Sequence, residues 1–264
     1  MIDFETVLIE RVGAVATVTM NRPESMNAFN SVLRRELLVV ARELNLDTSI
    51  HVVVLTGAGR AFGAGADLAE EQGEGMGLGP EVEDQLEYEY KPGVLAIAES
   101  SKVWIAAVNG PCAGISYSYA MACDMVVMAD SAFLYQPFAA IGLIPDGGST
   151  WLLSRLVGPR KAFELMICGE KVTAEKAVAL GLANHCFDDD GFKEQAAQFA
   201  QTIASKSPLA LRYTKEALRI SGNSHLGDAI SAEAKLQKLC IDSDDCKGAI
   251  NAFLAKKTYV WQGH

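Results

Sequence analysis

The chain has few basic residues for its length, and this shortage excludes one class of partner. Its 264 residues include 23 lysines and arginines against 33 aspartates and glutamates, which gives a formal charge of −10. A protein that binds the phosphate backbone of nucleic acid needs a face rich in lysine and arginine. The sequence therefore predicts no nucleic-acid partner, although a ligand with a few phosphates would need only a few local cations.

The chain also lacks the patterns of disulfide, metal and membrane proteins. Its six cysteines form no Cys-x-x-Cys pair and lie in apolar segments, which indicates free thiols in a reducing compartment. Its four histidines show no metal-ligand spacing, and neither a Walker sequence nor a Gly-x-Ser-x-Gly elbow is present. No apolar run reaches the roughly 20 residues that span a bilayer, and no signal-peptide pattern follows the first methionine. We expect a cytoplasmic protein with no metal and no membrane contact.

What the chain does have is a large apolar fraction in an α/β pattern. Half of its residues are hydrophobic, so we expect a sizeable core. A helix is predicted over 31–45, among strands predicted at 6–10, 15–20, 51–57, 103–110, 124–130 and 132–136. From about residue 159 the periodicity becomes helical. We therefore predict an α/β fold with a buried sheet, divided into a core over 1–200 and a helical C-terminal region over 201–264.

The segment 70–93 stands apart from both patterns. It is acidic and glycine-rich at its start and helix-like at its end. We interpret it as a solvated loop, because charge runs usually face water. A loop of this kind beside a pocket could still shape what the pocket accepts.

Two glycine-containing segments follow predicted strands and precede predicted helices. They are "GAGRAFGAGADL" (57–68) and "NGPCAGIS" (109–116). The first fails the Gly-x-Gly-x-x-Gly template of dinucleotide-binding proteins, because Phe62 stands at the third glycine position. Each segment alone is typical of an ordinary strand-to-helix turn. Together they could present two backbone N–H groups as an oxyanion hole for a carbonyl.

The stretch "IGLIPDGGSTW" (141–151) places one carboxylate, Asp146, among apolar and turn residues. Aspartate is a favoured N-cap, and Ser149 begins a segment with helical periodicity. The alternative is a general base in a dry pocket, where burial raises the pKa of a carboxyl group. The two roles are compatible.

Five motifs of the sequence resemble those of the enoyl-CoA hydratase/isomerase family, in the same order. They are "NRPESMNAFN" (21–30), "AFGAGADL" (61–68), "AAVNGPCAG" (106–114), "IGLIPDGGSTWLLSRLVG" (141–158) and "GEKVTAEKAVALGLAN" (169–184). The resemblance implies the crotonase fold, a spiral of ββα units with a helical C-terminal trimerisation region. It also implies an acyl-CoA substrate, no separate cofactor, and a homotrimer or homohexamer.

The resemblance assigns roles to five residues. It places the thioester carbonyl between the N–H groups of Ala66 and Ile115, the latter at a position where the family usually has glycine. Hydratases of the family carry two glutamates, and their positions fall on Ser118 and Phe138 here. Asp146 stands where isomerase members carry a single acid, including those similar to the phenylacetate-pathway isomerase. This pattern favours a double-bond isomerase in which one carboxylate moves a proton from the α-carbon to the γ-carbon.

The resemblance also implies the surroundings of that acid and the path of coenzyme A. Apolar walls from Ile115, Phe138 and Ile144 are expected to desolvate Asp146 and make it more basic. Lys256, with Phe253 close by, matches the cation that reaches a phosphate from a neighbouring subunit. Met26, Ala28, Ala64, Asp67 and Leu68 are expected to line the path of coenzyme A, largely through backbone atoms. The remaining expected substrate contacts are Gly114, Ser118 and Phe138.

Two other functions remain open at this point. The first is an enoyl-CoA hydratase in which Asp146 acts with water held by Ser118 or a nearby tyrosine. The second is a catalytically silent acyl-CoA-binding or scaffold protein that keeps the fold. Hydration of crotonyl-CoA separates the first alternative from an isomerase, and binding without turnover would indicate the second.

Overall fold

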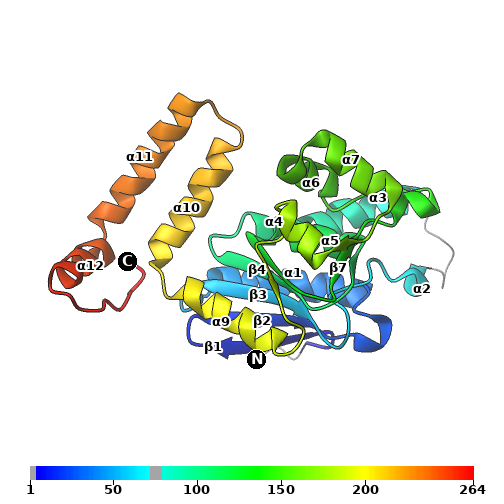
Figure 1. The fold of residues 1–264 in the computed structure, drawn as a ribbon, viewed down its shortest axis with the longest axis horizontal. Coiled ribbons are helices and arrows are strands. Elements are labelled where there is room, and N and C mark those ends of the chain that lie inside the picture. The colour runs from blue at the N-terminus through cyan, green and yellow to red at the C-terminus, as the bar shows by residue number, and fades with distance from the viewer. Residues whose placement is uncertain (1–3, 72–78) are drawn as a thin grey trace.

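Six strands form the main sheet of the computed structural model, which describes residues 4–71 and 79–264 (Figure 1). The strands predicted at 6–10 and 15–20 are confirmed, and they pair antiparallel as a hairpin around Gly13. All other neighbours in this sheet pair parallel. The spatial order is β1 (Val7–Val12), β2 (Val15–Met20), β3 (Val52–Gly57), β4 (Val103–Val108), β6 (Met125–Ala129) and β9 (His185–Phe187).

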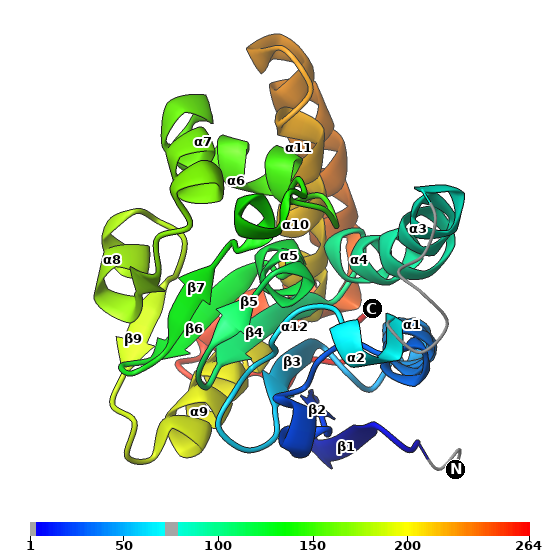
Figure 2. The ribbon, with the colours of Figure 1, turned by 90° about the vertical axis from the view of Figure 1, so that its right-hand side faces the viewer.

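Helices cover both faces of this sheet. Every residue of β4 is buried, which explains why its sequence reads as an uninterrupted apolar run rather than an alternation. α9 (Phe192–Ala204) packs on one face, against β2, β3 and β4. α5 (Ile115–Ala122) lies on the other face, beside α4 (Lys91–Ala98), which in turn packs on α1 (Ser31–Leu46) (Figure 2).

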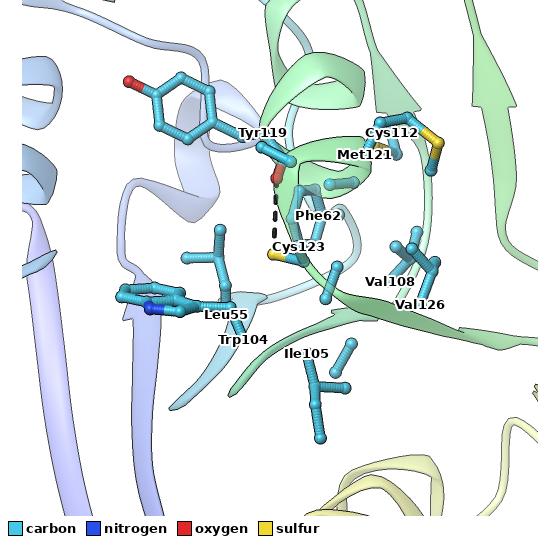
Figure 3. Packing of buried hydrophobic residues seen from close by; sticks show 14 of the residues in the cluster. Leu55, Phe62, Trp104, Ile105, Val108, Cys112, Tyr119, Met121, Cys123 and Val126 are labelled. Atoms are coloured by element: carbon cyan, nitrogen blue, oxygen red, sulfur yellow. Dashed lines mark hydrogen bonds between the residues drawn. The ribbon is translucent and has the colours of Figure 1, made fainter. Parts of the chain in front are cut away.

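α5 is buried along its whole length. All of its eight residues are shielded from solvent, which fits the uncharged sequence "ISYSYAMA". Below it, Phe62 and Ile105 pack near Cys123, whose thiol donates to the carbonyl of Tyr119 (Figure 3). Burial raises the pKa of the Tyr117 and Tyr119 phenols, so both stay protonated. This helix is therefore a rigid support for the segments that contact its first turns.

A second, smaller sheet connects the core to the helices that follow α5 in the chain. It has three short strands in the order β5 (Cys112–Ala113), β7 (Phe133–Tyr135) and β8 (Val172–Thr173). The elements that follow β7 form a helical layer on this side of the core (Figure 1). They are the 3-10 turn η3 (Phe138–Ile141), α6 (Ser149–Val157), α7 (Pro159–Cys168) and, after β8, α8 (Ala174–Ala179).

The acidic segment 70–93 is mostly helical where it is described. α2 (Leu68–Glu71) precedes residues 72–78, which lie outside the described residues. α3 (Gly79–Gln85) and a π-helical turn, η2 (Leu86–Tyr90), then lead into α4. Arg34 of α1 holds this turn through an ion pair of 2.6 Å with Glu89. The helix-like end of the segment is confirmed. From Gly79 onward the backbone is helical and not a loop; Leu86 and Tyr90 pack on the core, while the charged residues between Glu81 and Glu89 are exposed.

Three helices make up the C-terminal region and project from the core (Figure 1). They are α10 (Pro208–Ser221), α11 (Leu226–Asp242) and α12 (Asp244–Leu254). Within the single chain α10 has no buried residue, and α11 has only Ala229. Lys215 anchors α10 to the core by donating to two backbone carbonyls and to Asp124 at 2.9 Å. α9, which packs on the sheet, runs to Ala204 and so crosses the predicted division at residue 200.

Candidate active site

The two glycine-containing segments that follow β3 and β4 come together in the fold. Gly63 forms a parallel bridge with Cys112, and the N–H of Ala113 donates to the Gly63 carbonyl at 2.9 Å. The Gly65 N–H donates to Ser116 Oγ, on the first turn of α5, at 3.1 Å. The segment that contains Ala66 is thereby fixed against the start of α5.

Gly65 and Gly114 are in direct backbone contact. A Cβ added to Gly114 would lie 3.3 Å from Gly65 Cα, and both glycines have positive φ angles, +100° and +57°. The next residues, Ala66 and Ile115, therefore lie on adjacent backbone segments. Within residues 4–71 and 79–264, neither of their N–H groups donates a hydrogen bond to the backbone. Two adjacent donors of this kind, one of them at a helix N-terminus, suit a carbonyl oxygen that gains negative charge.

An ion pair supports the residue after Ala66. Asp67 lies 2.8 Å from Arg22, and its N–H donates to the Phe29 carbonyl at 3.1 Å. Burial alone would raise the pKa of Asp67, but the hydrogen bond and charge of Arg22 lower it overall. Because the pKa of Asp67 is lowered, the pair stabilises the folded state at every pH above the ordinary pKa of aspartate. This stabilisation is lost as the pH falls below that value and through the lowered pKa of Asp67. The Asp67 carboxylate thus holds the loop through Arg22.

Asn27 holds the same region from below and was not singled out from the sequence. It is fully buried and has a φ of +55°. Its side chain accepts from the Arg22 N–H and donates to the carbonyls of Ala58 and Ala61. Asparagine is one of the few residues that tolerate positive φ, so the sequence "MNAF" could have predicted a tight turn at Asn27. Ser116 and Arg22 were missed as well, because their roles depend on partners distant in sequence.

Asp146 precedes a tight turn in front of α6. Gly147 and Gly148 have φ angles of +57° and +85°, and the Ser149 N–H donates to the Asp146 carbonyl at 3.0 Å. Positive φ at both central residues is the pattern of a type I′ turn, which requires glycine-like residues. The N-cap of α6 is Gly148, with no side-chain cap bond. The Asp146 side chain is therefore not the cap, and it is half-buried.

This turn lies against α5. A Cβ on Gly147 would overlap Ile115 Cδ1 and lie 2.8 Å from Ser118 Cβ. Ser118 Oγ donates to the Asp146 carbonyl at 2.9 Å, and Ser118 is 0% exposed. Ser118 therefore supports the turn from inside the protein, and its predicted contact with the substrate stays a prediction.

The predicted apolar walls are only partly present. Ile115 and Phe138 are buried, and the Phe138 ring lies 3.9 Å from where a Cβ on Gly114 would be. Ile144, in contrast, is 79% exposed in the single chain. The expectation that it walls the site is wrong for one subunit, because η3 ends before it and the loop turns it outward. Asp146 is thus bordered by apolar groups on the side of α5.

A cavity of about 580 Å³ adjoins the turn. Gly147 and Gly148 form one wall, and α3, η2 and α4 form the rest. The apolar lining residues are Val82, Leu86, Val94 and Leu95, and the charged ones are Glu83, Glu87 and Lys91. Among the residues that the structure describes, no cluster of His, Cys, Asp and Glu could hold a metal ion, and no helix is long and apolar enough to cross a membrane.

The predicted coenzyme A contacts divide into two groups. The first group lies along the Ala66 segment, where the Ala64 N–H donates to the Met26 carbonyl at 3.0 Å. Ala28 and Leu68 flank this pairing on either segment. The second group, Phe253 and Lys256, lies at and just after the end of α12, and this helix is at the opposite end of the molecule from α2 and α6 (Figure 1). One chain therefore does not bring Lys256 to its own Asp146.

Comparisons with known proteins agree with this geometry. The sequence matches the enoyl-CoA hydratase/isomerase family over residues 10–264. It is 34% identical to the 1,2-epoxyphenylacetyl-CoA isomerase of Escherichia coli K12, over 100% of both chains. It is 35% identical to the 2,3-dehydroadipyl-CoA hydratase of the same organism, over 97% of this chain and 98% of the relative.

Solved structures give the same result for the fold. An enoyl-CoA hydratase from Bacillus anthracis superimposes with a TM-score of 0.94 at 29% identity, over 98% of this chain and 100% of that one. The predicted crotonase fold is thus confirmed. Relatives are named for both reactions, so similarity alone does not separate isomerase from hydratase. The chain belongs to the enoyl-CoA hydratase/isomerase family, whose members act on coenzyme A thioesters.

Proposed function

We propose that the protein is an enoyl-CoA isomerase that shifts the double bond of an enoyl-CoA thioester, with Asp146 as its proton carrier. The observation that supports this most strongly is the placement of Asp146. Its turn is packed on Ile115 and Ser118 at the start of α5. Serine and phenylalanine stand at the two positions that the resemblance assigns to the hydratase glutamates.

The geometry suggests a simple sequence of steps. The thioester oxygen accepts from the N–H groups of Ala66 and Ile115. The Asp146 carboxylate removes a proton from the α-carbon of a 3-enoyl-CoA, and the charge moves to the thioester oxygen as a dienolate. The Asp146 carboxyl group then returns the proton to the γ-carbon, which leaves a 2-enoyl-CoA. One acid suffices, because the proton is returned to the same molecule and nothing is added.

The cavity beside the turn supports an acyl group as ligand. Its volume, about 580 Å³, lies in the range of roughly 300–1,000 Å³ that small-molecule pockets occupy. Its walls combine valine and leucine side chains with the glycine backbone next to Asp146. We infer that the acyl chain of the thioester occupies this cavity, which begins at the two glycines after Asp146.

The hydratase alternative has weaker support. It needs a group that holds water near Asp146. The Ser118 hydroxyl is fully buried and already bonds to the Asp146 carbonyl and to Ser149. Tyr117 and Tyr119, on the same helix, are buried as well. The alternative of a silent binding protein would leave the placement of Asp146 without a role.

A comparison of two reactions tests the proposal. We expect the enzyme to convert trans-3-hexenoyl-CoA to the 2-enoyl ester at least roughly tenfold faster than it hydrates crotonyl-CoA, since both hydratase acids are absent. The rates are measured at saturating substrate by chromatography of the CoA esters. Faster hydration would assign the protein to the hydratases. Tight binding of both esters, and of an aromatic epoxide CoA, without any turnover would show a silent protein.

We also propose that the protein assembles as a trimer or a pair of trimers in which Lys256 and Phe253 reach a neighbour's ligand. The exposed faces of α10 and α11 support this, because apolar residues such as Ile230 and Leu239 are about half exposed in one chain. Lys256→Glu should weaken binding of hexanoyl-CoA by at most roughly tenfold, because a phosphate contact near solvent is screened. Turnover at saturation should be nearly unchanged.

The matched control is Lys257→Glu, which makes the same change of charge one residue away. Added salt should weaken binding by the unaltered protein more than binding by Lys256→Glu. Sedimentation equilibrium measures the assembly. A monomer, together with equal affinities for both variants and the unaltered protein, would contradict the assembly and the contact between subunits.

A further inference from the structure

Three buried side chains form a line of hydrogen bonds that ends at the Asp146 backbone. Gln136 Nε2 donates to Ser149 Oγ at 3.0 Å, Ser149 Oγ lies 2.7 Å from Ser118 Oγ, and Ser118 Oγ donates to the Asp146 carbonyl at 2.9 Å. Gln136 is 2% exposed, and both serines are 0% exposed. The line therefore joins β7, α6 and α5 behind the turn, with no access to solvent.

The chemistry of the groups fixes the direction of every bond in this line. The Asp146 carbonyl can only accept, so the Ser118 hydroxyl must donate its single proton to it. Ser118 Oγ then has to accept from the Ser149 hydroxyl, and Ser149 Oγ has to accept from the Gln136 amide nitrogen. The orientation of the Gln136 amide follows from this order. We call Gln136, Ser149 and Ser118 the support line, because they hold the turn and pass no proton to the substrate.

The support line is not explained by stability alone. Gln136 Oε1 is buried and accepts no hydrogen bond from the described residues. A buried polar atom without a partner lowers the free energy of unfolding, and an apolar side chain of the same size would avoid that loss. The presence of glutamine at this position is better explained by the hydrogen bond that its nitrogen donates to Ser149.

We propose that Gln136, Ser149 and Ser118 are positioning residues that fix the Asp146 carboxylate relative to the Ile115 N–H. The inference rests on the proposed role of Asp146 as the proton carrier. The Asp146 carbonyl accepts from two sides, from the Ser149 N–H and from Ser118 Oγ. A peptide plane held at both points restrains the backbone from which the Asp146 side chain extends.

The test compares Ser149→Ala and Ser118→Ala with trans-3-hexenoyl-CoA as the probe. Each variant should lower kcat roughly tenfold, because small misplacements of a reacting group are costly, with KM nearly unchanged. The double variant should be no slower than either single one, since each breaks the same line. In an Asp146→Asn background the same substitutions should leave the residual rate unchanged, because no carboxylate remains to be positioned.

Ser154→Ala is the matched control: it removes a serine hydroxyl from the same helix, one whose only hydrogen bond within residues 4–71 and 79–264 is to the Trp151 carbonyl. It should retain the full kcat. If Ser149→Ala does not fold, Gln136→Met removes the donor at similar size and replaces it in every comparison. Full kcat in the support-line variants, with Asp146→Asn inactive, would overturn this inference and leave the proposed function intact. Equal losses in both backgrounds would also overturn it, as a general structural effect. Full turnover in Asp146→Asn would instead overturn the proposed function.

Discussion

Asp146→Asn should lower the turnover of a 3-enoyl-CoA by about 10² to 10⁴ and leave binding of a CoA ester nearly unchanged. Asparagine has almost the same size but cannot accept the α-proton. The turn should survive the change, because it is held through the Asp146 carbonyl and the two glycines, and the side chain caps no helix. The loss should therefore appear in kcat and not in affinity.

Two measurements separate chemistry from binding in this variant. Exchange of the α-proton of the probe in deuterated water reports proton removal alone, and calorimetry with unreactive hexanoyl-CoA reports binding. Asp189→Asn is a control with the same chemical change, at an exposed loop that bonds to Ser131. It should behave as the unaltered protein. Turnover in Asp146→Asn equal to that of the unaltered protein would remove Asp146 from the mechanism.

The site depends on α5 as a spacer between two loops. Ser116 holds Gly65, next to the proposed oxyanion donor Ala66, while Ser118 holds the Asp146 turn. Residues two apart on a helix point in nearly opposite directions, because each residue turns it by about 100°. The two serines therefore fix the donor loop and the backbone of the Asp146 turn to the first turns of one buried element. The N–H of Ile115 opens that same element.

The sequence carried enough information for the fold but not for this support. The hairpin, the parallel strands and the two glycine segments follow from local patterns, since periodicity and turn residues reflect burial and backbone angles. The bond between Ser118 and Asp146 joins residues 28 positions apart. Sequence periodicity does not show which group a serine hydroxyl bonds to. A Ser118 that faces the turn therefore could not be distinguished from one that faces a ligand.

Two further features were out of reach for related reasons. Ile144 is exposed because the loop after η3 turns it away from the core, and apolar sequence alone cannot show that direction. Arg22 looks like a surface cation in the sequence, yet it pairs with Asp67 from a distant segment. The two glycines after Asp146, in contrast, correctly predict a turn. The sequence does not show which of the two contacts α5.

That contact distinguishes the two glycines sharply. Both have positive φ, so an alanine at either position bears a similar backbone strain. At Gly147 the added Cβ would overlap Ile115 Cδ1 and press on Ser118 Cβ at 2.8 Å. At Gly148 the nearest atom would be Leu152 Cδ1, at an ordinary distance of 3.9 Å. Only the first substitution forces the turn away from α5.

Gly147→Ala should therefore lower kcat for trans-3-hexenoyl-CoA roughly 100-fold, because it displaces the Asp146 carboxylate from the start of α5. Gly148→Ala carries the same backbone strain without the overlap and should lose less than about tenfold. Thermal unfolding of both variants shows whether the fold is equally stable, and α-proton exchange shows whether the acid still reaches the substrate. Equal losses in the two variants would mean that backbone strain alone matters. A Gly147→Ala enzyme as active as the unaltered protein would show that the packing of this turn on Ile115 and Ser118 does not set the position of Asp146.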